Sequence, residues 1–131
     1  MIDYLVVIPA RYNSSRFPGK PLADIHGKSM IQHVWEKCVK AASANKVLVA
    51  TDDERIINHC TDNGIQVELT SSNCLTGTDR LYEIAQKRKE KVYINVQGDE
   101  PLISPMDIQT VLLAAQKEPD ITINAMCPII N

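Results

Sequence analysis

Short apolar runs alternate with segments of helical periodicity along this chain. Residues 4–9 (YLVVIP) are continuously apolar, and residues 46–50 (KVLVA) and 91–96 (KVYINV) resemble them. Apolar runs of this length are typical of strands that are covered on both faces. Strands that alternate with helices favour a parallel sheet, because parallel neighbours need a crossover connection between them. We therefore predict an α/β fold in which helices flank a mostly parallel sheet.

The same patterns place the individual elements. The predicted strands are residues 4–9, 46–50, 66–70, 91–96 and 121–126, and three predicted helices cover about 29–43, 79–89 and 104–117. A further helix runs from a cap at Thr51, which has capping-box spacing to Glu54, to a stop at Asn63 and Gly64. Thr78 is a suitable N-cap for the helix at 79–89, and Ser104 caps the last helix.

The length and the net charge of the chain exclude several classes of protein. A chain of 131 residues has the size of one domain. Its net charge of −2 argues against a surface that coats nucleic acid, which usually carries a basic excess. The sequence has no apolar stretch of membrane-spanning length, and its first residues lack the features of a signal peptide. We therefore expect a cytoplasmic protein without nucleic-acid or membrane partners.

The cysteines give no sign of a metal or redox site. They show no CxxC spacing, and no histidine lies near them in a metal-binding pattern. We predict reduced, partly buried thiols. The four cysteines are Cys38, Cys60, Cys74 and Cys127.

Ligands of open parallel sheets bind outside the carboxyl ends of the strands, where the strand order reverses. This rule selects the loops at residues 9–28, 70–80 and 97–104. The first loop carries Arg11, Arg16 and Lys20, and arginine forks together with a lysine suit a phosphate group. The alternative is a solvated loop whose cations serve only solubility.

A string within the first loop superficially resembles a P-loop. Gly27, Lys28 and Ser29 open a helix, but Leu22 stands where that motif requires a glycine. We therefore reject a P-loop and predict that Ser29 caps the helix.

The other two loops carry polar groups of their own. Asp99 in VQGDEP is a candidate ligand for a hard cation, and Gln97 could hydrogen-bond a sugar or a base. An acidic turn without metal is the alternative. The segment from Thr76 to Arg80 leads into a helix N-terminus, which suits the polar edge of a nucleotide. A simple cap with Arg80 on the surface is the alternative there.

Taken together, these strings resemble the N-terminal part of the 3-deoxy-manno-octulosonate cytidylyltransferase (CMP-Kdo synthetase) family. The resemblance spans nearly the whole chain and is most specific in PAR-x4-R-x-PGKPL combined with QGDEP. It implies a Rossmann-like nucleotidyltransferase fold that binds CTP with Mg2+ and transfers CMP to an acidic sugar such as Kdo, for lipopolysaccharide biosynthesis. The strings are VVIPARYNSSRFPGKPL, MIQHVWE, VATDDERI, TGTDR and VYINVQGDEPLI.

The resemblance also implies residue roles. Arg11, Arg16 and Lys20 match the loop that holds the triphosphate, and Asp99 matches the first magnesium-binding aspartate of the family. The residues that match the surroundings of the cytidine are Ala10, Gln97, Thr78 and Arg80. Among all these, Arg11, Lys20 and Asp99 are the expected catalytic residues.

Members of this family are longer than this chain and form homodimers. We therefore expect residues 1–131 to be the nucleotide-binding, N-terminal part of a cytidylyltransferase domain, without most of the sugar pocket, the second metal-binding aspartate or the dimer interface. Nucleotide binding should then survive better than catalysis.

Other readings of the function stay open. They are CMP transfer to 8-amino-Kdo or to another nonulosonic or sialic acid, and an inactive nucleotide-binding fragment or module. A receiver-type signalling domain is disfavoured, because it needs acidic residues after the first strand, where this chain has Pro9, Ala10 and Arg11.

Overall fold

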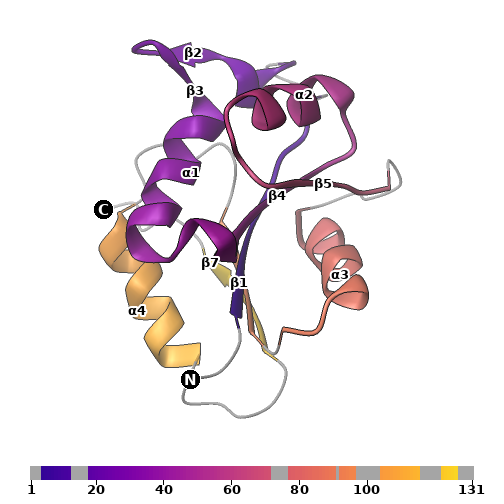
Figure 1. The fold of residues 1–131 in the computed structure, drawn as a ribbon. Coiled ribbons are helices and arrows are strands. Elements are labelled where there is room, and N and C mark those ends of the chain that lie inside the picture. The colour runs from indigo at the N-terminus through magenta and orange to yellow at the C-terminus, as the bar shows by residue number, and fades with distance from the viewer. Residues whose placement is uncertain are drawn as a thin grey trace.

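A computed structural model describes most of the chain and shows one five-stranded parallel sheet. The strands lie in the order β5-β4-β1-β6-β7, as Figure 1 shows. They are β1 (Tyr4–Pro9), β4 (Val47–Thr51), β5 (Val67–Leu69), β6 (Val92–Val96) and β7 (Thr122–Met126). The described residues are 4–12, 18–71, 77–90, 92–96, 104–115 and 122–126, with the backbone alone for 77, 78, 115 and 122–126.

Strand β1 lies at the centre of the sheet and is paired on both sides. Its partners are β4, with Val6 opposite Val47, and β6, with Val6 opposite Ile94. All five predicted strands are present, each with ends within one residue of the expected position. The predicted α/β fold with a mostly parallel sheet is confirmed.

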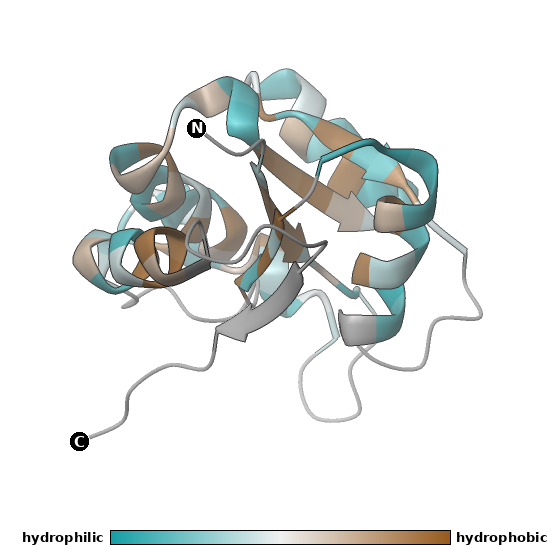
Figure 2. Cartoon of the chain, turned by 90° about the horizontal axis from the view of Figure 1, so that it is seen from below, coloured by the Kyte–Doolittle hydropathy of each residue, from teal (hydrophilic) through white to brown (hydrophobic). Residues whose placement is uncertain are grey.

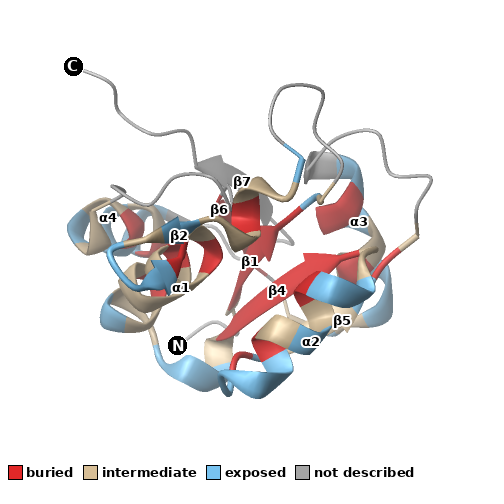
Figure 3. Cartoon of the chain, turned by 90° about the horizontal axis from the view of Figure 1, so that it is seen from above, coloured by how far each residue is buried: buried red, intermediate tan, exposed pale blue. Residues whose placement is uncertain are grey.

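Successive strand residues point to opposite faces, and each face packs against its own helices. Val6 and Ile8 belong to one core cluster, and Leu5 and Val7 belong to another. Helices α1 (Met30–Ala41), α2 (Glu54–Asp62) and α4 (Pro105–Ala115) contribute to the first cluster. Helix α3 (Gly77–Lys87) covers the second. Apolar residues gather on the strands and on the helix surfaces turned toward them (Figure 2), and β1 and β4 are buried (Figure 3).

The connection from β6 through α4 to β7 has the opposite hand to the other three. Helices α1 and α4 pack side by side on one face of the sheet (Figure 1). The chain moves outward in opposite directions from β1 to β4 and from β6 to β7. Crossovers between parallel strands are nearly always right-handed, and a right-handed connection here would put α4 on the other face. Among the described residues, α3 is consequently the single helix on that face.

Two predicted helix starts are confirmed and two are wrong. Ser29 caps α1, since its Oγ accepts from the Gln32 N–H at 3.2 Å, and Ser104 caps α4 through the Met106 N–H at 3.2 Å. The capping box at Thr51 does not form, because Thr51 ends strand β4 and Asp53 caps α2 instead. Thr78 is not a cap either, because α3 already begins at Gly77.

The sequence reasoning also missed a small hairpin before α1. Strands β2 (Asp24–Ile25) and β3 (Lys28–Ser29) are antiparallel and are joined by His26 and Gly27. Both linking residues have positive φ, 53° and 85°, as a tight primed hairpin turn requires. Lys28, which belongs to the rejected P-loop string, donates to the Glu36 carboxylate at 2.9 Å. Short 3-10 helices, η1 (Lys20–Leu22) and η2 (Ala44–Lys46), complete the described elements.

Cys38 and Cys60 are free thiols buried in the core, as predicted, and Cys74 and Cys127 lie outside the described residues. Burial raises the pKa of each of the two core thiols to about 12. None of the described helices is both long and apolar enough to cross a membrane.

The core thiols should be unreactive in the folded protein, because thiolate is the reacting species and burial suppresses it. In a variant with Cys74→Ser and Cys127→Ser, we expect Ellman's reagent to leave Cys38 and Cys60 unmodified under native, mildly alkaline conditions and to modify both in denaturant. Rapid native labelling of either thiol would contradict the packing described above.

Leu81→Ala should destabilise the fold strongly, because Leu81 is a fully buried residue of α3 that packs against the sheet, and α3 is the one described helix on that face. We expect a loss of about 2–5 kcal/mol in the free energy of unfolding, measured by denaturant titration. Tyr82→Ala is the control, since Tyr82 is 52% exposed on the same helix, and it should cost less than about 1 kcal/mol. Similar losses for both variants would argue against α3 as the cover.

Candidate functional site

The order of the strands reverses between β1 and β6. From β1 the chain moves outward to β4 and β5, then returns across the sheet to β6 and continues to β7. In open parallel sheets, this reversal point at the carboxyl ends of the strands is where ligands bind. The loops that follow β1 and β6 are therefore the first place to look for a site.

The two described ends of the loop after β1 are in contact with each other, at Tyr12 and Gly19. Ala10 is buried and its N–H donates to the Ala50 carbonyl at 2.9 Å, which fixes the exit of the strand. The Gly19 N–H donates to the Tyr12 carbonyl at 2.6 Å, so the end of the loop returns to its start. Arg11 is exposed and precedes this contact, and half-buried Lys20 follows it as the first residue of η1. Two of the three predicted cations are thus brought together at the carboxyl end of β1.

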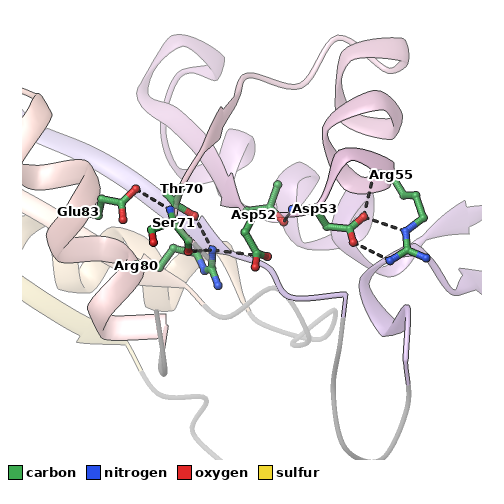
Figure 4. Close-up of polar contacts among 8 residues, drawn as sticks. Asp52, Asp53, Arg55, Thr70, Ser71, Arg80 and Glu83 are labelled. Atoms are coloured by element: carbon green, nitrogen blue, oxygen red, sulfur yellow. Dashed lines mark hydrogen bonds and ion pairs between the residues drawn. The ribbon is translucent and has the colours of Figure 1, made fainter. Parts of the chain in front are cut away.

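Arg80 contributes a third positive charge to this edge of the sheet, from the other face. Its side chain is 1% exposed, and its Nη1 donates to Thr70 Oγ1 and, at 3.5 Å, to the Ser71 carbonyl. The same nitrogen lies 3.7 Å from Asp52 Oδ1 (Figure 4). Asp52 directly follows β4 and Thr70 directly follows β5. The alternative interpretation of the sequence, in which Arg80 lies on the surface, is therefore wrong.

Besides Glu68 Oε2, whose carboxylate is paired with Arg88, two buried polar atoms on this face have no hydrogen-bond partner among the described residues. They are Arg80 Nε, a donor, and the side-chain oxygen of Asn95, an acceptor near the end of β6. Buried polar groups are almost always paired in native proteins, so unpaired ones call for an explanation such as a bound ligand or water. Both atoms lie toward the strand ends where the rule for parallel sheets expects a ligand.

The two consecutive carboxylates after β4 form ion pairs with two different arginines. Asp52 points toward Arg80, and Asp53 points the other way toward Arg55 (Figure 4). Asp53 makes a two-pronged pair with Arg55, with 3.0 Å from Nε to Oδ1 and 2.7 Å from Nη2 to Oδ2. The hydrogen bonds from Arg55 hold the pKa of the Asp53 carboxyl below its ordinary value. The guanidinium of Arg55 in turn lies over the ring of Tyr12, 3.2 Å from the ring centroid.

The remaining predicted site residues stay predictions. Arg16, Gln97 and Asp99 lie outside the described residues, and Thr78 is placed only by its backbone in the first turn of α3. The part of the chain that the structure describes contains no group of three or more acidic, histidine or cysteine side chains arranged to hold a metal ion.

Sequence reasoning missed the residues that support the predicted cations. Asp52, Asp53 and Arg55 stood in the string VATDDERI, which carried part of the family resemblance but gave these three residues no role. Two adjacent carboxylates directly after a buried strand were the available signal, because such residues emerge at the ligand-binding edge of the sheet. Nothing in the local pattern indicated that Arg80 would be buried.

An open parallel sheet with cations gathered at its carboxyl edge places this chain in the Rossmann-like nucleotide-binding class of α/β folds. The chain belongs to the cytidylyltransferase family, whose sequence profile matches residues 5–126.

Relatives within this family are similar over nearly the whole chain. The 3-deoxy-manno-octulosonate cytidylyltransferase of Escherichia coli is 45% identical over 131 residues, which cover 100% of this chain and 53% of that protein. The protein of the same name from Syntrophotalea carbinolica is 47% identical and is matched over 95% of this chain and 50% of its own length. The chain thus spans about half the length of the curated relatives that it matches.

Solved structures agree with the fold. A CMP:2-keto-3-deoxy-manno-octonic acid synthetase complexed with CTP superposes with a TM-score of 0.85 at 47% identity, over 89% of this chain and 48% of that one. A cytidylyltransferase from Leptospira borgpetersenii gives 0.77 at 21% identity, over 91% of this chain and 51% of that one, and supports the fold alone. The predicted family resemblance and the Rossmann-like nucleotidyltransferase fold are confirmed.

Thr70→Val should destabilise the protein, because it removes the hydroxyl acceptor of buried Arg80 and leaves its Nη1 with the longer contacts to the Ser71 carbonyl and Asp52 alone. We expect a loss of about 1–3 kcal/mol in the free energy of unfolding, measured by denaturant titration. Thr110→Val is the matched control, since its hydroxyl is exposed and donates to the Met106 carbonyl on α4. The control should change stability by less than about 0.5 kcal/mol, and equal losses would disprove the role of Thr70.

Proposed function

We propose that this protein transfers CMP from CTP to 3-deoxy-manno-octulosonate and releases pyrophosphate, in a reaction that depends on magnesium. The relatives from Escherichia coli and Syntrophotalea carbinolica, both named 3-deoxy-manno-octulosonate cytidylyltransferase, support the choice of reaction. The similar synthetase structure that holds CTP supports the choice of nucleotide. The observation that carries the proposal is the return of the loop after β1, which brings Arg11 and Lys20 to the sheet edge where such folds bind ligands.

In this reaction the anomeric hydroxyl oxygen of the sugar forms a bond to the α-phosphorus of CTP. The bond from that phosphorus to the oxygen that bridges to the β-phosphate breaks, the hydroxyl proton is released, and pyrophosphate leaves. Negative charge builds on the phosphoryl oxygens during transfer, and fixed cations stabilise it. Arg11, Arg16 and Lys20 supply these cations, and the reaction needs no covalent intermediate on the protein.

Ala10, Gln97, Thr78 and Arg80 surround the cytidine in this proposal. The location of Arg80 is compatible with that role, because its unpaired Nε is a donor at the carboxyl edge of the sheet. The buried Asn95 oxygen is a second polar atom on the same face. Base recognition by such buried groups is selective, since a wrong base leaves them unpaired.

Asp99 holds magnesium in this proposal, together with phosphate oxygens of the nucleotide. A hard cation of this kind prefers oxygen ligands and commonly binds through one or two carboxylates plus substrate phosphates. The pairing of β6 with β1 supports this choice, because the segment that carries Asp99 follows β6 in the sequence. Asp52 and Asp53 are less suitable, since each already faces an arginine. Bound magnesium would neutralise phosphate charge and polarise the phosphoryl group. The homodimer and the cytoplasmic location stay predictions.

Isothermal titration calorimetry with CTP and magnesium tests the binding step. Arg11→Ala and Lys20→Ala should each weaken CTP binding about 10- to 100-fold, because each removes a charge-assisted contact to phosphate. Lys46→Ala is the control, since Lys46 precedes β4 at the opposite edge of the sheet, and it should bind CTP like the unchanged protein. Absence of CTP binding by the unchanged protein would overturn the proposed function.

A pyrophosphate-release assay tests the sugar and the metal. We expect release with Kdo in the presence of magnesium, and a loss of release with chelator or with Asp99→Asn. Comparison with 8-amino-Kdo and N-acetylneuraminate identifies the sugar. Tight CTP binding without release from any of these sugars would instead favour a nucleotide-binding module.

A further inference from the structure

Tyr12 joins the two ends of the loop that carries the cations. Its carbonyl accepts the Gly19 N–H at 2.6 Å. Gly19 also lies against its ring, because a Cβ at Gly19 would be 3.0 Å from the ring edge. Gly19 has a φ of 75°, a left-handed conformation that glycine adopts without strain. The positions of Arg11 and Lys20 therefore depend on where Tyr12 is held.

Arg55 holds the ring of Tyr12 from helix α2. Its guanidinium carbon lies 3.2 Å from the ring centroid, in a cation–π arrangement. The orientation of the guanidinium is itself fixed, because two of its nitrogens donate to the two oxygens of Asp53. Asp53 is anchored in turn as the N-cap of α2, where it accepts the Arg55 backbone N–H at 2.8 Å. A continuous chain of contacts thus runs from the start of α2 to both ends of the loop.

We propose that Arg55 is a positioning residue, which acts through Asp53 and Tyr12 to hold the cationic loop in place before a nucleotide binds. Arg55 acts in this role through its contacts within the protein, because its Nε and Nη2 donate to Asp53 and one face of its guanidinium lies on Tyr12. The identity of the ligand rests on the proposed function, but the positioning of the loop does not. A loop that is already in place lowers the ordering cost of binding, so loss of Arg55 should weaken affinity without removing a phosphate contact.

Amide hydrogen exchange tests the positioning without any ligand. In the full chain, Arg55→Ala should raise the exchange rate of the Gly19 amide about threefold or more. A change of this size is expected when the opening equilibrium loses the free energy of one cation–π contact. Amides in the interior of α1 should be unchanged. Arg88→Ala is the matched control: Arg88 makes the same kind of pair with a glutamate two residues later, at 3.2 Å, beyond the end of α3. An unchanged Gly19 exchange rate in Arg55→Ala would overturn the proposal, whether or not the protein binds CTP.

Calorimetry with CTP and magnesium gives the second measurement. We expect Arg55→Ala to raise the Kd for CTP about three- to fivefold. Arg55→Lys should be similarly impaired, because an ammonium group lacks the planar fork that both stacks and pairs. Tyr12→Phe keeps the ring and should bind like the unchanged protein.

A double variant of Tyr12 and Arg55 distinguishes loss of loop positioning from general destabilisation of the fold. In a Tyr12→Leu background, Arg55→Ala should cause no further change in Kd, since the contact is already lost. Equal Kd values for Arg55→Ala and the unchanged protein would overturn the proposal. If the unchanged protein binds no CTP, the proposed function fails, and the exchange rates still decide the role of Arg55.

Discussion

The burial of strand β1 on both faces governs where this chain can place its charges. Residues 5–8 are completely buried between β4 and β6 and beneath helices on either side. A charged side chain in that stretch would lose its hydration without compensation, so charges appear only after the strand ends. The first cations in the described part of the chain, Arg11 and Lys20, consequently follow the strand at its carboxyl edge, beside the point where the strand order reverses. The constraint that produces the core thereby also locates the candidate site.

The end of β4 links the two faces of the sheet at this edge. Asp52 turns toward Arg80 of α3, while Asp53 turns toward Arg55 of α2 (Figure 4). Adjacent residues that leave an extended strand point to opposite sides, so one dipeptide can serve both layers. Through Tyr12, the second of these pairs reaches the loop after β1. A short acidic sequence therefore connects three segments that lie far apart in the chain.

Features that depend on a local sequence pattern could be predicted from the sequence. Features that depend on contacts between distant segments could not. Apolar runs located β1, β4 and β6 to within one residue, because burial on both faces leaves a continuous signal. The cap of α2 was misplaced because Thr51 has suitable chemistry, yet it is needed as the last residue of β4. The hairpin at His26 and Gly27 depends on two positive φ angles, one in a residue that seldom adopts them. The burial of Arg80 results from long-range packing, which no local spacing encodes.

Arg80 is a buried cation whose charge is only partly compensated by its neighbours. Its Nη1 donates to the neutral hydroxyl of Thr70, but the Asp52 carboxylate lies 3.7 Å away and Nε has no partner among the described residues. A strong charge-assisted hydrogen bond has a length of about 2.7–2.9 Å. A buried cation that is compensated this weakly is costly to the folded state. A ligand that supplies an acceptor would bind only the folded chain and would shift the folding equilibrium toward it. Occupancy of the proposed site would therefore be coupled through Arg80 to the stability of the α3 face, because α3 carries this arginine.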